Sequence, residues 1–322
     1  MEQRYLPSAG LLTSRLALGT MMFGGQTGEQ ESLRIMDLAL ERGVNHFDTA
    51  NVYNQGESER LVGKAIKGRR DKVVLATKVF GQMGDNPLDQ GLGRRHILSE
   101  VEHSLKRLDT DHIDIYYLHA PDYSTPLEET LMTMDMLIRA GKIRYYGVSK
   151  FAAWQVADIL RLCEQTGLAK PVIGQYVYNL LTRGIEGELL PFLKAHPMGL
   201  SIYNPIAAGL LSGKHTGGQP EAQTRFSFSQ MYHDRYWTDE NFAAVDKLKA
   251  IARDHGMNLL QLALRWLASN PQVSTIICGV SKLEQLEQNV QALEEPALSA
   301  ECLAACDAVW HGLAGTRLVY YR

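Results

Sequence analysis

The sequence predicts an α/β protein folded as a closed (β/α)8 barrel, the TIM-barrel architecture, in a single domain over residues 1–322. Eight short β-rich runs alternate with longer amphipathic segments along the chain. Most of the runs are nearly continuously apolar, which is typical of parallel strands covered on both faces. Parallel neighbours need long crossover connections, and the regularly spaced amphipathic segments provide them. A doubly wound parallel sheet is the alternative, and no linker rich in Pro, Gly or Ser divides the chain.

The predicted strands and helices follow one another in regular order. We expect strands at 15–23, 44–48, 73–79, 113–119, 143–149, 172–179, 199–205 and 273–280. Between them we expect helices at 30–42, 57–67, 95–108, 126–140, 152–166, 185–195 and 282–292. Gly43 and Gly141 stand where two of these helices should end, because glycine readily adopts the left-handed conformation found after a helix C-terminus. Thr125 followed by Pro126 predicts an N-cap and a first helical residue.

Three parts of the chain are additional to the strands and helices of a minimal barrel. Residues 4–12 predict a short hairpin before the first barrel strand. The stretch 205–240 is long and polar and contains glycines, which indicates a functional loop after the seventh strand. Additional helices are expected at 240–255, 258–269 and 299–312.

Composition narrows the range of functions. The formal net charge of −3 offers no basic field for nucleic acid, and no run of 18 apolar residues predicts a membrane span. The four cysteines contain no CxxC pair, and the N-terminal segment MEQRYLPSAG does not resemble a secretory signal. We therefore expect a cytoplasmic protein that acts on a small molecule, without nucleic-acid or membrane partners. A homo-oligomer is compatible with these observations.

Several short motifs do not match the binding signatures that they resemble. The segment 91-GLGRRH-96 lacks the third glycine of the GxGxxG dinucleotide fingerprint. The segment 209-GLLSGK-214 has three residues, instead of the four of a P-loop, between its first glycine and its GK pair. No group of His, Cys, Asp and Glu has the spacing of a metal site, so no metal is expected.

Four ionisable residues lie where three consecutive strands end. Asp48 ends the second strand and Tyr53 follows five residues later, while Lys78 and His119 end the third and fourth strands. Catalytic groups of a (β/α)8 barrel lie at the C-terminal ends of its strands, so these side chains should converge at one mouth. Each residue alone also has a structural interpretation: a loop cap, a packing tyrosine, a paired lysine or a core histidine. Together they indicate one catalytic site.

These residue types predict a proton transfer to a carbonyl oxygen. A tyrosine hydroxyl titrates near pH 10, and a neighbouring lysine should lower that pKa. Asp48 would keep Lys78 charged and in place, and His119 would hydrogen-bond the carbonyl oxygen. Because no serine or cysteine nucleophile and no metal is implicated, the reductant must be an external hydride donor, a nicotinamide. A Schiff-base aldolase or isomerase that uses Lys78 as its nucleophile is a rival interpretation.

Three motifs resemble the aldo-keto reductase family, in the family's order and spacing across nearly the whole chain. They are 47-FDTANVYNQGESERLVGKAI-66, 113-IDIYYLHAPD-122 and 276-IICGVSKLEQLEQNV-290. The resemblance implies a (β/α)8 barrel that binds NADP(H) without a Rossmann domain and reduces an aldehyde or ketone to the alcohol. It places the family's catalytic tetrad on Asp48, Tyr53, Lys78 and His119, with Tyr53 as the proton donor.

The resemblance also implies the cofactor contacts. Ser149 and Gln175 would bind the nicotinamide carboxamide, and Tyr203 would stack on the ring. The loop after the seventh strand would wrap the pyrophosphate, and the start of the last barrel helix would hold the 2′-phosphate, which favours NADP over NAD. The residues implied for these parts are Asn204, Pro205, Gly209, Leu210, Lys214, Arg225, Gly279, Ser281, Lys282, Gln285, Gln288 and Asn289. Many relatives have asparagine after the serine, whereas this chain has Lys150, which leaves one carboxamide contact unassigned.

Within the family, three segments are most similar to the aflatoxin-aldehyde and succinic-semialdehyde reductase branch. They are 119-HAPDYSTPLEETL-131, 178-YNLLTRGIEGELLP-191 and the ending 319-VYYR-322. That branch recognises carboxylate-bearing aldehydes with arginines, and the resemblance points to Arg235 and Arg322. Other relatives act as ion-channel β-subunits, so a cofactor-binding regulatory or sensor protein with vestigial reductase activity is the alternative function.

Overall fold

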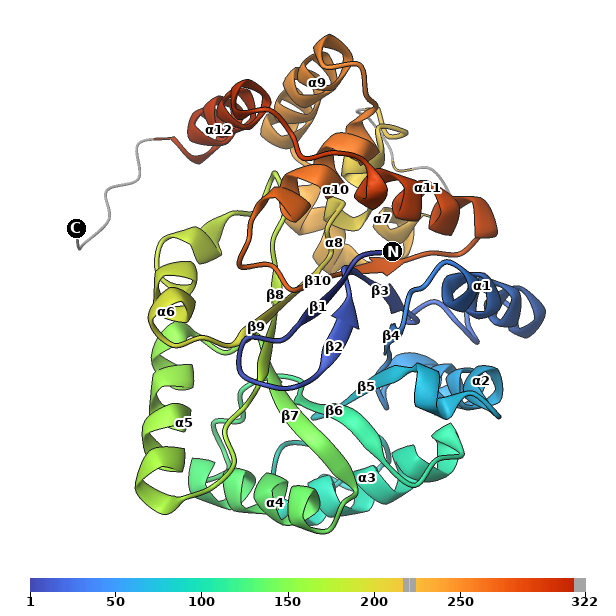
Figure 1. Ribbon diagram of the computed structural model, residues 1–322, viewed down its shortest axis with the longest axis vertical. Helices are drawn as coiled ribbons and strands as arrows, with labels where there is room; N and C mark the ends of the chain where they lie inside the picture. The colour runs from blue at the N-terminus through green and yellow to red at the C-terminus, as the bar shows by residue number, and fades with distance from the viewer. Residues whose placement is uncertain (217–219, 221–223, 316–322) are drawn as a thin grey trace.

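The structure of the chain is a computed structural model, which describes residues 1–216, 220 and 224–315. Eight parallel strands close into a barrel in the order β10-β3-β4-β5-β6-β7-β8-β9 (Figure 1). The predicted (β/α)8 barrel is therefore confirmed, and the doubly wound alternative is excluded. The strands are β3 (Leu16–Gly19), β4 (His46–Asp48), β5 (Val74–Val79), β6 (Ile113–Leu118), β7 (Ile143–Ser149), β8 (Ile173–Val177), β9 (Gly199–Tyr203) and β10 (Thr275–Gly279).

The barrel strands bury both faces, as their apolar runs predict. All six residues of β5 are buried, as are five of the six in β6. Inward side chains such as Ala76, Ile115 and Tyr117 pack inside the barrel, while outward side chains join the larger core beneath the helices. The register pairs Asp48 with Ala76. Because side chains alternate in direction along a strand, Lys78 also points inward, two residues nearer the mouth.

Helices alternate with the strands and surround them in Figure 1. Each helix buries one stripe; in α5, for example, Val156, Ile159 and Cys163 are buried at the spacing of one helix face. Gly43 and Gly141 follow the ends of α1 and α4 with φ angles of 76° and 72°, as predicted. The crossover helices are α1 (Glu29–Glu41), α2 (Glu57–Ile66), α3 (Arg94–Leu108), α4 (Leu127–Arg139), α5 (Ala153–Thr166), α6 (Leu189–Ala195) and α11 (Leu283–Glu294).

Two helix starts differ from the prediction. The Thr125 hydroxyl donates to Asp122 Oδ2 at 2.8 Å, so it does not cap α4, and Pro126 occupies the N-cap position instead. The segment 185–195 is not one helix. It begins as a 3-10 turn, η3 (Gly184–Glu186), and α6 starts only after Glu188, whose φ of −134° is not helical.

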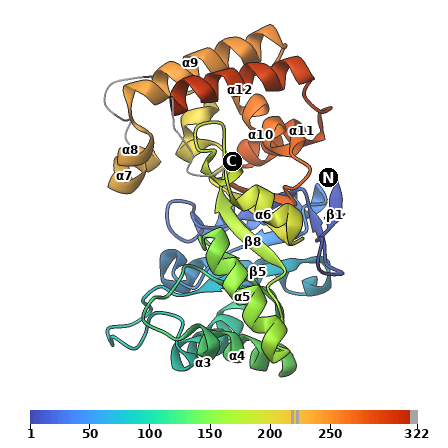
Figure 2. The ribbon, with the colours of Figure 1, turned by 90° about the vertical axis from the view of Figure 1, so that its left-hand side faces the viewer.

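The two ends of the barrel are covered differently. The predicted N-terminal hairpin is confirmed as β1 (Gln3–Tyr5) paired antiparallel with β2 (Leu12–Ser14), and Leu6 packs into the inner cluster of the barrel. Figure 2 shows β1 on the opposite side of the molecule from α7 and α8. The remaining elements are η1 (Tyr53–Gly56), η2 (Arg70–Lys72), η4 (Ala207–Ser212), α7 (Arg225–Phe228), α8 (Gln230–Tyr236), α9 (Asp239–Asp254), α10 (Leu259–Ser269) and α12 (Ala300–Ala314).

The loop predicted at 205–240 thus carries η4, α7 and α8, and the expected extra helices appear as α9, α10 and α12. Among the residues described, no helix combines the length and apolar character needed to cross a membrane.

Candidate active site

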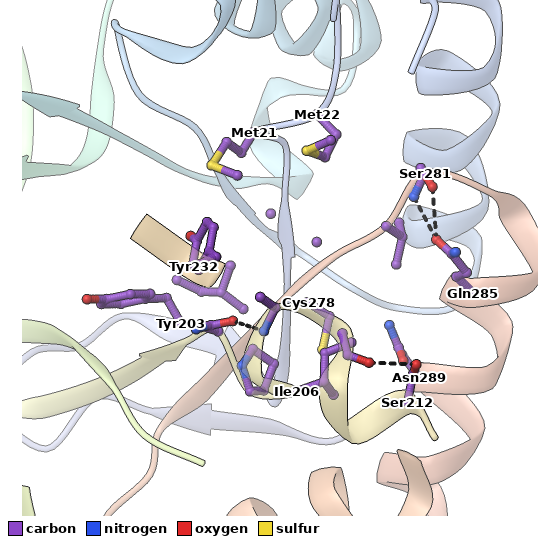
Figure 3. A pocket seen from close by; sticks show the side chains of 18 of the residues that line it. Met21, Met22, Tyr203, Ile206, Ser212, Tyr232, Cys278, Ser281, Gln285 and Asn289 are labelled. Carbon is purple, nitrogen blue, oxygen red and sulfur yellow. Dashed lines mark hydrogen bonds between the residues drawn. The ribbon is translucent and has the colours of Figure 1, made fainter. Parts of the chain in front are cut away.

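A cavity of about 800 Å³ opens at the end of the barrel where the strands terminate. Its size lies within the range of small-molecule and cofactor sites. Residues from the ends of β3, β4, β8, β9 and β10 line it, together with the loop after β9 and the start of α11. Figure 3 shows Met21 and Met22 on one side of this cavity, Tyr203 and Tyr232 on another, and Ser281, Gln285 and Asn289 toward the far end.

The lysine and aspartate predicted for the site form a buried ion pair beneath this cavity. Lys78 Nζ lies 2.6 Å from Asp48 Oδ1 and 2.7 Å from the Thr49 carbonyl oxygen. The Lys78 side chain is fully buried. The other carboxylate oxygen, Asp48 Oδ2, accepts a hydrogen bond of 2.9 Å from Gln175 Nε2. One carboxylate oxygen is therefore held by a donor from the neighbouring strand β5 and the other by a donor from β8, which is not adjacent to β4, and this fixes the direction of the pair.

Tyr53 reaches the same point from a strained turn. It begins η1, in which Asn54, Gln55 and Gly56 have φ angles of 48°, 54° and 86°. Asn54 stabilises this left-handed path by donating from Nδ2 to the carbonyl oxygens of Met21 and Phe23. The turn directs the phenol inward, and Lys78 Nζ donates to Tyr53 Oη at 3.5 Å.

These contacts leave the tyrosine proton facing the cavity. An ammonium group has three hydrogens, and the three oxygens near Lys78 Nζ belong to Asp48, Thr49 and Tyr53. Because the phenol oxygen accepts from Lys78, the phenol's own proton is available to a bound molecule. A lysine held in this way is a cation and a poor nucleophile, which argues against the Schiff-base interpretation.

His119 completes the group at the mouth. Its ring meets the Tyr53 ring edge-on, with centroids 6.2 Å apart and planes at 81°. Burial, together with the nearby Lys78 and Lys150 ammonium groups, lowers the pKa of His119 to about 2. The imidazole is therefore neutral at physiological pH, so it can donate a hydrogen bond without adding charge.

The pKa of Tyr53 corrects one expectation from the sequence. Burial raises the pKa of the Tyr53 hydroxyl above its ordinary value, and the neighbouring Lys78 ammonium only partly offsets this. The predicted lowering by Lys78 is wrong in net direction, because desolvation of the phenolate outweighs the attraction of the lysine. For Lys78, burial lowers the pKa, but Asp48 and Tyr53 outweigh burial and raise it overall. The pair thus favours a protonated phenol beside a charged lysine.

The residues predicted for the nicotinamide lie near this group, but their side chains differ in access. Gln175 and Tyr203 line the cavity. Ser149 is buried behind them, and its hydroxyl donates to the Gln175 carbonyl oxygen at 3.2 Å. Asn204 lines the cavity with a φ of 59°, and its side chain holds the following turn by accepting from Ala208 N at 2.5 Å. Lys150, with a φ of 65°, also lines the cavity.

The residues predicted for the phosphates and adenosine lie at the far end. Ser281 donates from its backbone N and its Oγ to Gln285 Oε1, at 2.8 and 3.3 Å (Figure 3). Leu210 is buried in the core, and the exposed Lys282 at the N-cap of α11 does not line the cavity. The side chain of Arg225 lies outside the part of the chain that the structure describes. The residues of this group that do line the cavity are Pro205, Gly209, Lys214, Gly279, Ser281, Gln285, Gln288 and Asn289.

The chemistry of this end fits a phosphorylated dinucleotide. Gly209 has a φ of 109°, a conformation that side chains rarely adopt, and it leaves backbone exposed to the cavity beside Lys214. The lining combines a lysine, hydroxyl and amide side chains and a helix start, which are donors suited to phosphate oxygens. Over the described residues, no cluster of three or more His, Cys, Asp or Glu could hold a metal ion.

Several lining residues were not predicted from the sequence. Met21 and Met22 follow β3, and Met231 and Tyr232 come from α8. The rule that identifies Asp48 and His119, the end of a barrel strand, would also have identified the two methionines after β3. No signal in the sequence indicates which residues of the 205–240 loop turn inward. Arg235 lines the cavity, whereas Arg322 lies outside the described residues.

Comparisons with known proteins identify the family of the chain. The model of the aldo/keto reductase family matches residues 15–311. A probable voltage-gated potassium channel subunit beta from Oryza sativa subsp. japonica is 37% identical over 317 residues, covering 96% of each chain. Aflatoxin B1 aldehyde reductase member 2 from Rattus norvegicus is 37% identical and covers 95% of this chain and 87% of its own. The chain therefore belongs to the aldo/keto reductase family of oxidoreductases, which reduce carbonyl groups.

Proposed function

We propose that this protein reduces an aldehyde or ketone to the alcohol with NADPH, and that Tyr53 donates the proton. The observation that carries the proposal is the contact of 3.5 Å between Lys78 Nζ and Tyr53 Oη at the wall of the cavity. When bound, NADPH supplies a hydride from nicotinamide C4 to the carbonyl carbon. The proton, and the groups that stabilise the developing negative charge on the carbonyl oxygen, come from this chain's own residues.

Tyr53 acts as the general acid. Its raised pKa keeps the phenol protonated, and the nearby Lys78 cation stabilises the phenolate that remains after the proton has left. Asp48 holds Lys78 charged and in place. The neutral His119 donates a hydrogen bond to the carbonyl oxygen, so the developing alkoxide meets two donors.

Further residues, most of which line the cavity, hold the cofactor. Gln175, supported by Ser149, binds the nicotinamide carboxamide, and Tyr203 covers one face of the ring. Backbone N–H groups around Gly209 and the Lys214 ammonium bind the pyrophosphate. The start of α11 binds the adenosine 2′-phosphate, with the lining residues Ser281, Gln285, Gln288 and Asn289 and with the exposed Lys282 at the N-cap. These assignments favour NADP(H) over NAD(H).

A second candidate function is a cofactor-binding regulator with vestigial reductase activity. The relatives named as potassium channel subunits beta favour it. The contacts among Asp48, Tyr53 and Lys78 favour a working reductase. Oxidation of bound NADPH by a reactive aldehyde in a single turnover separates the two.

The four buried free cysteines support our proposal of a reducing, cytoplasmic location.

Replacing the proposed acid tests the mechanism directly. Tyr53→Phe should retain NADPH binding but lower the turnover of 4-nitrobenzaldehyde by about 100- to 10,000-fold, because the variant lacks the proposed proton donor. The measurement is NADPH consumption at 340 nm together with a fluorescence titration of NADPH. Tyr123→Phe, which changes an exposed phenol outside the cavity, is the matched control. Reduction by Tyr53→Phe at the wild-type rate would refute the assignment.

The pKa directions predict the pH profile. Because the pKa of Tyr53 is raised, the phenol stays protonated and kcat/KM for reduction should stay level between about pH 6 and 9, falling only at higher pH. With a His119 pKa of about 2, no inflection near 6.5 is expected. A loss of rate centred near pH 7 to 8, absent from a Tyr53→Phe background, would show that Lys78 lowers the pKa of Tyr53 after all.

The 2′-phosphate provides a test of cofactor preference. NADPH should bind about tenfold or more tightly than NADH, because the added phosphate gains charge-assisted hydrogen bonds at the start of α11. Lys282→Met should reduce this preference without weakening NADH binding. Fluorescence titrations of both cofactors measure the effect. Equal affinity for NADH and NADPH in the unaltered protein would contradict the assignment.

Arg235 and Arg322 are proposed to recognise an acidic group on the substrate. Arg235→Gln should raise KM for 4-carboxybenzaldehyde about two- to fivefold, the scale of an exposed ion pair, and leave KM for 4-nitrobenzaldehyde unchanged. Arg161→Gln, an exposed arginine on α5, is the matched control. Equal changes with both aldehydes would remove the charge-recognition role.

A further inference from the structure

Lys150 introduces a positive charge beside the proposed nicotinamide site. It follows the last residue of β7, and its backbone N donates to the Gln175 carbonyl oxygen at 3.2 Å. Ser149 Oγ donates to the same oxygen. The φ of 65° at Lys150 turns the chain away from the strand direction, and the Lys150 side chain lines the cavity. Lys150 therefore extends from the same backbone that supports the proposed carboxamide contacts.

Among the described residues, no acid compensates the charge of Lys150, and the charges that act on it are those of Lys78 and Arg235. Within the same part of the chain, neither Lys150 nor Arg235 forms an ion pair, although both line the cavity. Asp48 is the one carboxylate among the described lining residues, and it is bound to Lys78 and Gln175. Lys78, Lys150 and Arg235 repel one another strongly enough to lower the pKa of Lys150, after the larger effect of burial. The mouth of the cavity thus carries an excess of positive charge.

Oxidised and reduced nicotinamides differ in charge at this point. The ring of NADP⁺ carries a positive charge that the ring of NADPH lacks, while the phosphates are the same. A cation beside the ring repels the oxidised form and leaves the reduced form nearly unaffected, because the reduced ring is neutral. An asparagine at this position would provide a hydrogen bond, but it would carry no charge that distinguishes the oxidised ring from the reduced ring.

We propose that Lys150 makes the site bind NADPH in preference to NADP⁺, by electrostatic repulsion of the oxidised ring. The inference rests on the proposed nicotinamide site. It assigns to Lys150 a role in releasing the oxidised product and in keeping the protein loaded with the reduced cofactor.

Two substitutions separate charge from hydrogen bonding. Lys150→Asn removes the charge, retains a hydrogen-bonding side chain and suits the positive φ. Lys150→Met removes the charge and keeps a long side chain. Lys170→Asn, an exposed lysine paired with Glu164 at 2.7 Å outside the cavity, is the matched control. Dissociation constants for NADPH and NADP⁺ are measured on each full-length protein by fluorescence titration and calorimetry, without substrate.

In the unaltered protein and in Lys170→Asn, NADP⁺ should bind about tenfold more weakly than NADPH. Both Lys150 variants should bring the two constants close together, mainly by tightening NADP⁺. If both constants change equally in the variants, or if their ratio stays unchanged, Lys150 does not act through the charge of the ring and the inference is wrong, while the proposed function stands. If the unaltered protein binds neither cofactor, the proposed function itself is wrong.

Discussion

The fully buried Lys78–Asp48 ion pair is the constraint on which the rest of the site depends. A lysine inside a barrel needs a counter-charge, because an unpaired buried ion costs several kcal/mol of stability. Asp48 provides that charge at 2.6 Å from the neighbouring strand. Once the ammonium is held there, its remaining hydrogens are directed at the Thr49 carbonyl and at Tyr53. The contacts that compensate the buried charge of Lys78 therefore also place its ammonium group against the phenol.

Burial and charge combine differently at the two groups nearest the cavity. At Tyr53 burial raises the pKa of the hydroxyl although Lys78 opposes it, whereas at His119 burial and the nearby ammonium groups both lower the pKa and keep the imidazole neutral. Both outcomes suit donation of a hydrogen to an oxygen that gains negative charge. The neutral pair of Asp48 and Lys78 leaves Lys150 and Arg235 to determine the charge of the mouth. The proposed reduction ends with an alcohol and an oxidised, cationic nicotinamide ring, and we expect the positive charge of the mouth to repel that ring.

Much of the fold followed from the sequence, because strand and helix periodicity are local properties. All eight barrel strands, the N-terminal hairpin and the extra helices lie where the patterns predict them. The prediction was wrong at Thr125, whose hydroxyl bonds to Asp122 in the preceding loop instead of capping α4. It also treated 185–195 as one helix, although the backbone at Glu188 interrupts it. In both cases a neighbouring contact or a backbone angle outweighed the residue preference.

The sequence by itself determined which ionisable residues stand at the ends of successive strands and hence that Asp48, Tyr53, Lys78 and His119 would meet. Only the tertiary structure decided their distances, the inward turn of Met21 and Met22, the burial of Ser149 and Leu210, and the raised pKa of Tyr53. The physical reason is that desolvation depends on every atom packed around a group. Those atoms come from strands and loops that are distant in the chain, and no local pattern records them.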